Sequence, residues 1–568
     1  MVPLSLALAA CTDALRRPGP ASDRLTPVEQ AVRVSTAIRG IRPTPDELRW
    51  VDADPNALGA LVDAWLRSPG FGETIRDLHA EQLRIRTDVD EQLPLDGPLA
   101  GFDTATVHRG LAEAPLKLIE DVVTSGRPYT EIVTTDTLQV SAVYAIVHGL
   151  PFDPDGPDWQ TAQWDDGRPR AGILSDSELW RRHRSAGSNF HRGRANLVAS
   201  TLLCEDFATR DVPVEGGIDL SDELAVAEAV STQTTCVACH QALDPLAAFF
   251  WGFRHQLNAQ AVRNSYEAGC AYPIDDPDPL PGHGIPTDLC YPLRTYQPEL
   301  EDDWAVWGLR PPGYYGLPGR DLVDLGRYLA EDDRFATCTA KRFWSWFAEV
   351  PVSDVDDAWA ATLRDALVDA DWDARGLVKA IVTSDRFLSR DGVGPLTTRP
   401  EQLARTIEDL TGFRWTVDPD RGACTTECWR DVDLTVSDRY GFRAMAGGID
   451  GVSVTRPTRS PTPVRRLVLE RLAGEAASAV VETDFALPAA DRRLLGGVEL
   501  DTDDDPTLRA ALVELHARIG GELVTPNGPV VDRTLRLLRD ADALTGDRRR
   551  SWKIVLTAML QDSHLEFE

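Results

Sequence analysis

Apolar residues recur at three- and four-residue spacing along most of the chain, which is the pattern of amphipathic helices. Polar residues fill the intervening positions, so each such helix has one face suited to a core. The spacing predicts helices over the following ranges: 58–66, 75–85, 106–123, 192–203, 321–350, 354–387 (two helices), 400–413, 463–483, 506–523, 530–544 and 552–560.

Start signals for helices support this pattern. Residues 26–29 (Thr-Pro-Val-Glu) and 44–47 (Thr-Pro-Asp-Glu) each supply an N-cap, a first-turn proline and a glutamate at the third helical position. Residues 175–178 (Ser-Asp-Ser-Glu) have the same capping-box spacing. We therefore expect helices to begin directly after Thr26, Thr44 and Ser175.

Three stretches break the helical pattern. Residues 130–150 alternate like a strand or a short hairpin. Residues 151–172 and 258–320 are rich in Pro, Gly and Asp, and the second is long enough to suggest a functional or ligand-wrapping loop. The predicted fold class is mostly α, a multi-helix body with minor β.

Composition narrows the class of protein. Hydrophobic residues make up 43% of the 568-residue chain, which is enough for sizeable cores and excludes a wholly disordered protein. Asp and Glu number 90 against 59 Lys and Arg, a formal net charge of -31. This balance disfavours a nucleic-acid partner and electrostatic attachment to anionic lipid.

The N-terminus has the features of an export signal. The apolar run of residues 1–10 ends in Leu8-Ala9-Ala10-Cys11, which resembles a bacterial lipobox with Cys11 as the lipidated residue. No Lys or Arg precedes the run, so a late start or an ordinary apolar N-terminus with a chance cysteine stays open. A polar, Pro-bearing tether follows. We expect an exported lipoprotein, membrane-anchored in the bacterial periplasm or at the cell surface.

The motif that carries chemistry is Cys236-Val-Ala-Cys239-His240. Cys-x-x-Cys-His is the attachment signature of c-type haem. Two thiols one helical turn apart each add to one porphyrin vinyl group, and the adjacent histidine reaches the iron. The alternatives are a disulfide or redox pair and half of a zinc site. The zinc alternative lacks a second Cys/His pair, because no histidine lies near Cys424 and Cys428.

The sequence from Cys236 to Phe253 resembles the CxxCHxxxDPLGFxxENF block of planctomycete-type cytochrome c domain proteins, which are large, exported and mostly uncharacterised. The chain departs from that block at residues 247–248 (Ala-Ala) and 251–252 (Trp-Gly). The resemblance implies a cytochrome c-like haem domain within a helical multi-domain body, with one haem c and no known substrate. Looser similarity covers 25–83, 172–204, 335–387, 441–451 and 552–567.

The sequence does not decide which group, if any, binds the iron on the distal side of such a haem. His283, in a Pro/Gly loop, and Met445 are candidate sixth ligands; another residue or an open iron are the alternatives. Asp244-Pro245 follows the motif closely, where it would position the imidazole. The four aromatic residues between 249 and 253 would form either an apolar wall for the porphyrin or ordinary core.

The other cysteines suit disulfides. Besides Cys11 and the motif pair, six of the nine cysteines remain, an even number for an oxidising compartment. Sequence proximity favours Cys270–Cys290 and Cys424–Cys428, which leaves Cys204–Cys338 by elimination. Buried free thiols are the alternative.

Several weaker signals are interpreted as structural. Residues 369–373 and 501–505 have calcium-like acidic spacing but lack the glycine and glutamate of such loops. His79 and His516 lie on helical patterns, and the aromatic stretch 343–347 is typical of core.

These observations predict five segments: a lipoprotein signal and tether (1–25), an N-terminal helical domain (26–171), the haem domain (172–320), a helical domain (321–400) and a C-terminal helical domain (401–568). The leading hypothesis is an electron-transfer protein whose acidic surface steers a basic redox partner. A haem enzyme of peroxidase or oxygenase type, with an open distal site, is the alternative. A surface-binding or scaffold lipoprotein is the third.

Overall fold

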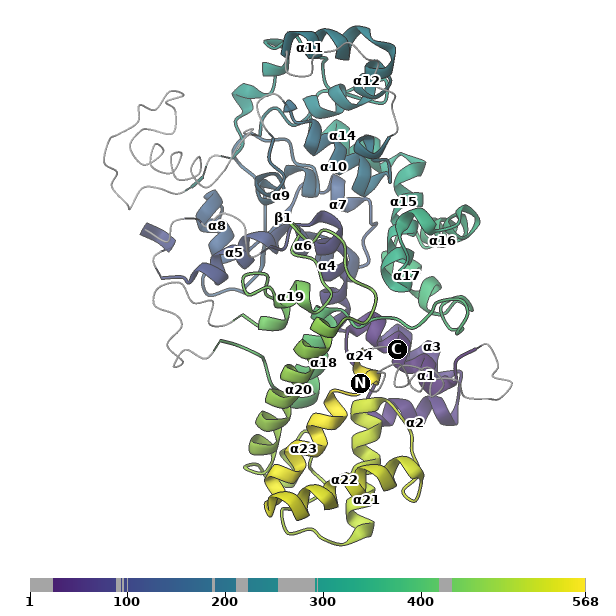
Figure 1. Cartoon of the computed structure of the whole chain (residues 1–568). Coiled ribbons are helices and arrows are strands. Elements are labelled where there is room, and N and C mark those ends of the chain that lie inside the picture. The colour runs from purple at the N-terminus through teal and green to yellow at the C-terminus, as the bar shows by residue number, and fades with distance from the viewer. Residues whose placement is uncertain are drawn as a thin grey trace, which may run out of the picture.

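The computed structural model describes residues 24–87, 93, 97–99, 101–185, 189–210, 223–253, 292–293, 295–417 and 432–566. The structure is 60% helix and 3% strand, which confirms the prediction of a mostly α fold. The molecule is elongated, with α11 (Glu223–Thr232) and α12 (Thr234–Ala248) at one end and the C-terminal helices of residues 505–560 at the other (Figure 1). No helix among the described residues combines the length and apolarity needed to cross a bilayer.

The N-terminal third holds eight helices of the described chain, and their bounds are as follows: α1 (Pro27–Arg39), α2 (Pro45–Ala53), α3 (Ala57–Trp65), α4 (Pro69–Leu83), α5 (Thr104–Ala112), α6 (Ala114–Thr124), α7 (Glu131–Thr134) and α8 (Ala142–His148). Antiparallel strands β1 (Leu138–Val140) and β2 (Gln160–Ala162) form a small sheet in which Leu138 pairs with Ala162.

The middle of the chain contains α9 (Ser177–Arg182), α10 (Arg192–Leu202), α11 (Glu223–Thr232), α12 (Thr234–Ala248), α14 (Leu322–Ala330), α15 (Asp333–Ala348), α16 (Asp357–Asp369) and α17 (Ala374–Val382). Short 3-10 turns η6 (Pro298–Leu300) and η7 (Asp303–Ala305) precede a second small sheet, β3 (Gly313–Tyr314) with β4 (Leu317–Pro318).

The C-terminal part contains α18 (Pro400–Thr411), α19 (Phe442–Met445), α20 (Pro463–Asp484), α21 (Asp505–Leu515), α22 (Pro529–Thr545), α23 (Arg548–Leu560) and α24 (Ser563–Glu566). A π-helical turn at His516–Gly520 continues α21.

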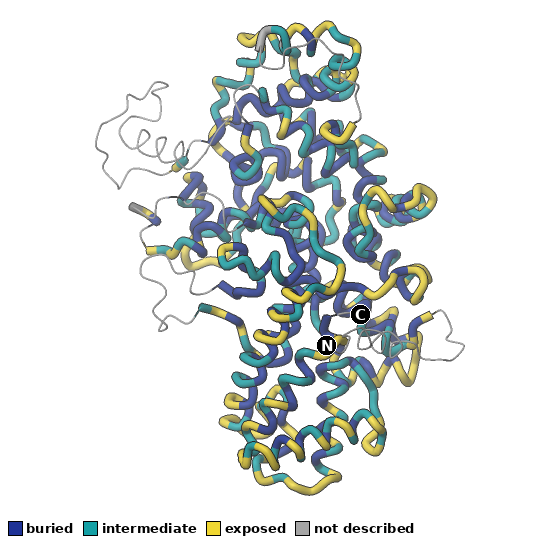
Figure 2. The backbone as a smooth tube through the Cα atoms, viewed as in Figure 1, coloured by how far each residue is buried: buried dark blue, intermediate teal, exposed yellow. Residues whose placement is uncertain are grey.

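Two main cores hold these helices together. The larger one draws residues from Ala31 to Leu396 and so includes all three predicted segments between 26 and 400. The second runs from Leu403 to Leu565 and belongs to the C-terminal helices. Figure 2 shows buried backbone along the inside of both parts and exposed backbone on their outer turns.

The capping predictions are confirmed at two of three positions. Thr26 accepts from the Glu29 backbone N–H at 3.3 Å, and Glu29 accepts from the Thr26 N–H at 2.9 Å. Thr44 and Glu47 repeat this reciprocal pair. The prediction that Ser175 caps a helix is wrong, because Asp176 accepts the N–H groups of the first turn of α9 instead.

Three other expectations are corrected. The helix expected over 106–123 is split into α5 and α6, with Pro115 in the first turn of α6. The strand-like stretch 130–150 is mostly α7 and α8, with only β1 between them. The helix expected over 321–350 is two helices, because Asp332 caps a new helix by accepting from the Arg334 N–H at 2.8 Å.

Candidate functional site

The Cys-x-x-Cys-His motif lies on α12, which packs against α10 and α11 at one end of the molecule (Figure 1). Cys236 and Cys239 are one helical turn apart on this helix. Both are free thiols and both are half-buried. The two sulfur atoms are therefore chemically available from one stretch of a single rigid element.

The ring of His240 is oriented by a carboxylate on the same helix. Its Nδ1 atom lies 2.8 Å from Oδ1 of Asp244, one turn further along. The His240 side chain is 22% exposed, and Nε2 has no hydrogen-bond partner among the described residues. With Nδ1 tied to the carboxylate, Nε2 is the nitrogen left to bind a metal.

Asp244 is held in turn by Arg192, the first residue of α10. Arg192 Nε donates to Asp244 Oδ1 at 2.7 Å, and Nη2 donates to Oδ2 at 3.2 Å. Burial acts to raise the pKa of Asp244, but the hydrogen bonds from His240 and Arg192 outweigh it, so the pKa lies below its usual value. The carboxylate is ionised and accepts a hydrogen bond from Nδ1–H.

The aromatic residues after the motif belong to the main core. The side chains at positions 249, 250, 251 and 253 are at most 5% exposed. Phe250 packs on Trp180 with ring centroids 4.6 Å apart, and Phe253 meets Tyr296 at 4.8 Å. They anchor the C-terminal end of α12, which supports the core interpretation. The aromatic stretch 343–347 is likewise confirmed as core.

The arrangement also bears on the alternatives to haem. Cys236 and Cys239 are not joined in a disulfide. Across the described ranges, no group of three or more His, Cys, Asp or Glu side chains is placed to hold one metal ion. The thiols and the imidazole of α12 thus do not converge on one point as zinc ligands do. Haem attachment does not require the ligands to converge on one point, since each of the two thiols reaches a different vinyl group.

The remaining predicted site residues divide into two groups. Met445 ends α19 and packs against the C-terminal core, well away from α12 in Figure 1, so this arrangement does not place it opposite His240. The others lie outside the described residues: Cys11, Cys270, His283, Cys290, Cys424 and Cys428.

One disulfide is present in the described chain. Cys204, just after α10, is bonded to Cys338 of α15 with an S–S distance of 2.05 Å. This is the pairing that the sequence analysis reached by elimination. It fastens the helix that carries Arg192 to the helix that carries the buried aromatic stretch.

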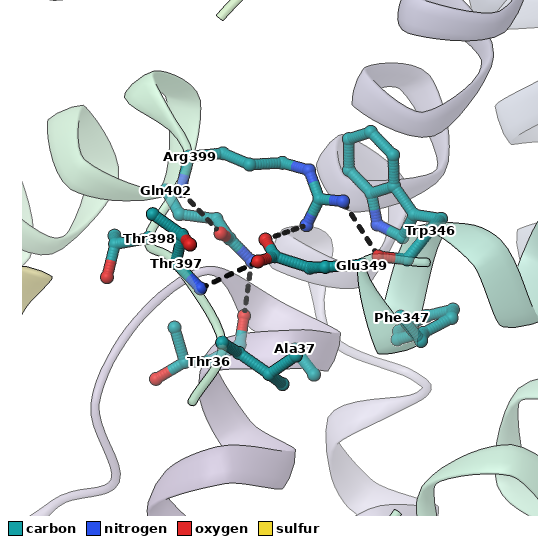
Figure 3. A pocket seen from close by; sticks show the side chains of 10 residues that line it. Thr36, Ala37, Trp346, Phe347, Glu349, Thr397, Thr398, Arg399 and Gln402 are labelled. Carbon is teal, nitrogen blue, oxygen red and sulfur yellow. Dashed lines mark hydrogen bonds and ion pairs between the residues drawn. The ribbon is translucent and has the colours of Figure 1, made fainter. Parts of the chain in front are cut away.

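A pocket between α1, α15 and α18 is a structural junction and not a ligand site (Figure 3). Glu349 accepts from the Thr397 N–H at 2.8 Å and lies 3.6 Å from Arg399, whose guanidinium stacks 3.5 Å from the Trp346 ring centroid. The cavity volume is about 20 Å³, which accommodates a single water.

Arg192 is the site residue that sequence reasoning missed. It lies 52 positions before Asp244, and nothing in its local pattern distinguishes it from other arginines. Asp244 did carry a signal, since an acidic residue four positions after a histidine shares its helix face. His79 is confirmed as structural, because it is buried and bonded to Ile75 O and Tyr129 Oη, both at 2.7 Å.

Comparison with known proteins gives one match. Residues 316–387, from just before β4 to just after α17, match the model of a family described as a protein of unknown function (DUF1585). No curated protein and no solved structure matches the chain. The matched domain is one found in planctomycete-type cytochrome c proteins, which the sequence around Cys236 also resembles.

Proposed function

We propose that this chain is an exported, lipid-anchored c-type cytochrome-like protein of the planctomycete type, which binds one haem covalently and transfers electrons. The observation that carries the proposal is the donor set of α12. Two free, half-exposed thiols lie one turn apart, and the adjacent His240 keeps Nε2 available while Asp244 holds Nδ1. These are the groups that haem c requires.

The chemistry of attachment suits the state of the two thiols. Cys236 and Cys239 would each add an S–H across one vinyl C=C bond of the haem, which forms a C–S bond and puts the hydrogen on the neighbouring carbon. The addition needs no oxidant, but it needs reduced thiols, and Cys236 and Cys239 are reduced. Haem held there supplies one-electron iron chemistry.

The chain's own residues would tune that haem. His240 is the proximal ligand, and the Asp244 carboxylate fixes its tautomer and makes it a stronger donor. Arg192 withdraws part of the carboxylate's negative charge through two hydrogen bonds. Asp244 and Arg192 would thus act in opposite directions on how strongly the imidazole donates electrons to the iron.

Two further observations support the same proposal independently. The match at residues 316–387 is to a domain found in planctomycete-type cytochrome c proteins. The lipobox-like sequence ending at Cys11 suits a haem that is attached after export. Replacing Cys11 with Ser is expected to move the protein from the membrane fraction to the soluble fraction.

The decisive experiment is expression in a host with haem-attachment machinery, followed by a haem stain on a denaturing gel. The intact chain is expected to stain, and a Cys236→Ser/Cys239→Ser variant is expected not to. Cys204→Ser/Cys338→Ser is the matched control, since it removes two cysteines elsewhere and keeps the stain. A stain that survives in the Cys236→Ser/Cys239→Ser variant contradicts the proposal.

A haem enzyme with an open distal site is the second candidate. The hydrogen bond between His240 and Asp244 favours it, because a more basic imidazole stabilises oxidised iron. Carbon monoxide and cyanide distinguish the two functions. Fast binding of both ligands supports the enzyme, whereas a six-coordinate iron that binds neither supports electron transfer.

A further inference from the structure

An exposed, acidic surface lies close to the Arg192–Asp244 pair. Residues 298–309 carry four carboxylates and no Lys or Arg. Within this segment Val306 is 81% exposed and Trp307 is 63% exposed. We call Glu299, Asp302, Asp303, Val306 and Trp307 the acidic tryptophan surface. Large apolar side chains this exposed beside a row of carboxylates are typical of a contact site for another protein.

The turn that presents Trp307 has a defined backbone. The Val306 N–H donates to Asp303 O at 3.0 Å, and the Gly308 N–H donates to Ala305 O at 3.1 Å. The Leu309 N–H closes the turn on Trp304 O at 3.0 Å. Gly308 has a φ of 65°, a conformation that glycine adopts without strain. Trp307 is thus displayed by a hydrogen-bonded turn.

A continuous set of contacts joins Trp307 to Arg192. The ring of Trp307 lies 5.8 Å from that of Phe190, between centroids. Phe190 also stacks on Trp251 at 6.2 Å, which fixes its position. The guanidinium carbon of Arg192 lies 5.4 Å from the Phe190 centroid.

From Arg192 the contacts continue through Asp244 to His240, by hydrogen bonds of 2.7 Å and 2.8 Å. The exposed indole is therefore connected to the motif histidine by packed rings and charged hydrogen bonds. Among the described residues, Trp50 is the other exposed tryptophan, and it lies on α2, away from α12 (Figure 1). These contacts form one connected route between Trp307 and His240.

We propose that the acidic tryptophan surface is the docking site for a basic electron-transfer protein. The inference rests on the proposed function and adds to it the face that meets the partner. The carboxylates would steer the approach of a cationic face, and Trp307 would supply the central apolar contact. The chain's net charge of -31 favours the same class of partner over the whole surface.

The test measures binding of a basic monohaem cytochrome c, used as the probe, to the full chain at low and high ionic strength. Trp307→Ala is expected to raise the dissociation constant about tenfold or more, and Trp307→Phe to retain most of the affinity. Asp302→Asn/Asp303→Asn is expected to lower the association rate several-fold at low salt, with the difference lost at high salt.

Matched controls are available at the other end of the molecule. Trp50 of α2 is 48% exposed, so Trp50→Ala removes a comparable indole. Asp52 and Asp540 are exposed on α2 and α22, so Asp52→Asn/Asp540→Asn makes the same charge change far from α12 (Figure 1). Equal binding by Trp307→Ala and Trp50→Ala overturns the proposal, as does a wild-type chain that does not bind the probe.

The docking proposal and the haem proposal can be contradicted independently of each other. The Cys236→Ser/Cys239→Ser variant should bind the probe as tightly as the intact chain, because the acidic tryptophan surface lies outside the motif. If the intact chain carries no haem but Trp307→Ala still weakens binding, the proposed function falls and the docking site stands. If the haem stain is present but Trp307→Ala has no effect on binding, the docking site falls alone.

Discussion

Two histidines of this protein each contact a carboxylate that also pairs with an arginine. One of these sets of side chains is buried, and the other is partly exposed. His148 lies 3.0 Å from Glu178, which also pairs with Arg181. His240 lies 2.8 Å from Asp244, which also pairs with Arg192. The side chains of the first set are 1%, 2% and 8% exposed. In the second set His240 is 22% and Arg192 17% exposed.

This difference in burial decides what each histidine can do. Burial lowers the pKa of His148 despite the neighbouring Glu178, so its imidazole is neutral. Glu178 accepts a hydrogen bond from Nε2–H, and Nδ1 is enclosed without a hydrogen-bond partner among the described residues. His240 also contacts a carboxylate through one ring nitrogen, but its side chain is 22% exposed. A carboxylate partner prepares a histidine to bind a metal only where the other nitrogen is accessible.

The largest expected effect comes from removing the buried carboxylate. Glu178→Ala should lower the free energy of unfolding by about 3–5 kcal/mol, because it breaks a buried ion pair with Arg181 and the contact with His148. Urea unfolding measures the loss. Asp244→Ala is the matched change and should cost about 1–2 kcal/mol, because water reaches Arg192. Equal losses at the two positions would contradict the distinction.

Truncating the histidines separates stability from ligation. His148→Ala should cost about 2–4 kcal/mol through the cavity it leaves, with an unchanged haem spectrum. His240→Ala should change stability by about 0.5 kcal/mol or less but alter the Soret band, because the proximal ligand is lost. Optical spectra and urea melts of both variants test this. A spectral change in His148→Ala but not in His240→Ala would show that the iron is not bound by His240.

Neutralising Asp244 should act on the haem more than on the fold. Asp244→Asn should cost about 1 kcal/mol and raise the midpoint potential, because a neutral amide makes His240 a weaker donor. Arg192→Gln should lower the potential, since the carboxylate then keeps its full negative charge. Redox titration measures both shifts. Shifts of the same sign in the two variants would show that Arg192 does not act through Asp244.

The two sets also predict opposite slopes of stability against pH. Burial, then the charge of Glu178, raises the pKa of Asp176 to about 7. Its ionisation therefore favours the unfolded chain, and stability is lost as pH rises from about 4 to about 7. The lowered pKa of Asp244 works the other way: its contribution is present above pH 3.8 and is lost as pH falls through its folded pKa.

Urea unfolding between pH 3 and pH 8 tests the two slopes. The Asp176→Asn difference should grow by at most about 1.4 kcal/mol per pH unit, in favour of the variant as pH rises. The Asp244→Asn difference should favour the wild type as pH rises from the acid side. Parallel differences would mean that the two carboxylates share one environment.

Local chemistry explains which parts of the fold were predictable. The Thr26 and Thr44 caps act within four residues, so the sequence alone defines where α1 and α2 begin. The boundary between α14 and α15 was missed because apolar spacing continues across Asp332, whose capping bond competes with an unbroken helix. Apolar and polar residues alternate over 130–150, but the helices there are buried on several sides. The two-residue period therefore predicted a strand where the structure has mostly helix.

The same division holds for the candidate site. Cys236, Cys239 and His240 are recognised by their spacing, because one helix places all three. The Arg192 contact depends on how α10 packs against α12, and no local pattern encodes that packing. Met445 was a candidate because methionine is a common sixth haem ligand and its surroundings look turn-like, but it packs against the C-terminal core.

The disulfide between Cys204 and Cys338 has a consequence for how the protein matures. Cys204 and Cys338, 134 residues apart in sequence, are oxidised to a disulfide, while Cys236 and Cys239, three residues apart, are free. The proposed haem attachment would require the second pair to stay reduced. Under the proposed function, one chain would need one cysteine pair oxidised and another kept reduced in the same compartment. An order of events follows, in which the long-range bridge closes while the neighbouring thiols are kept from pairing with each other.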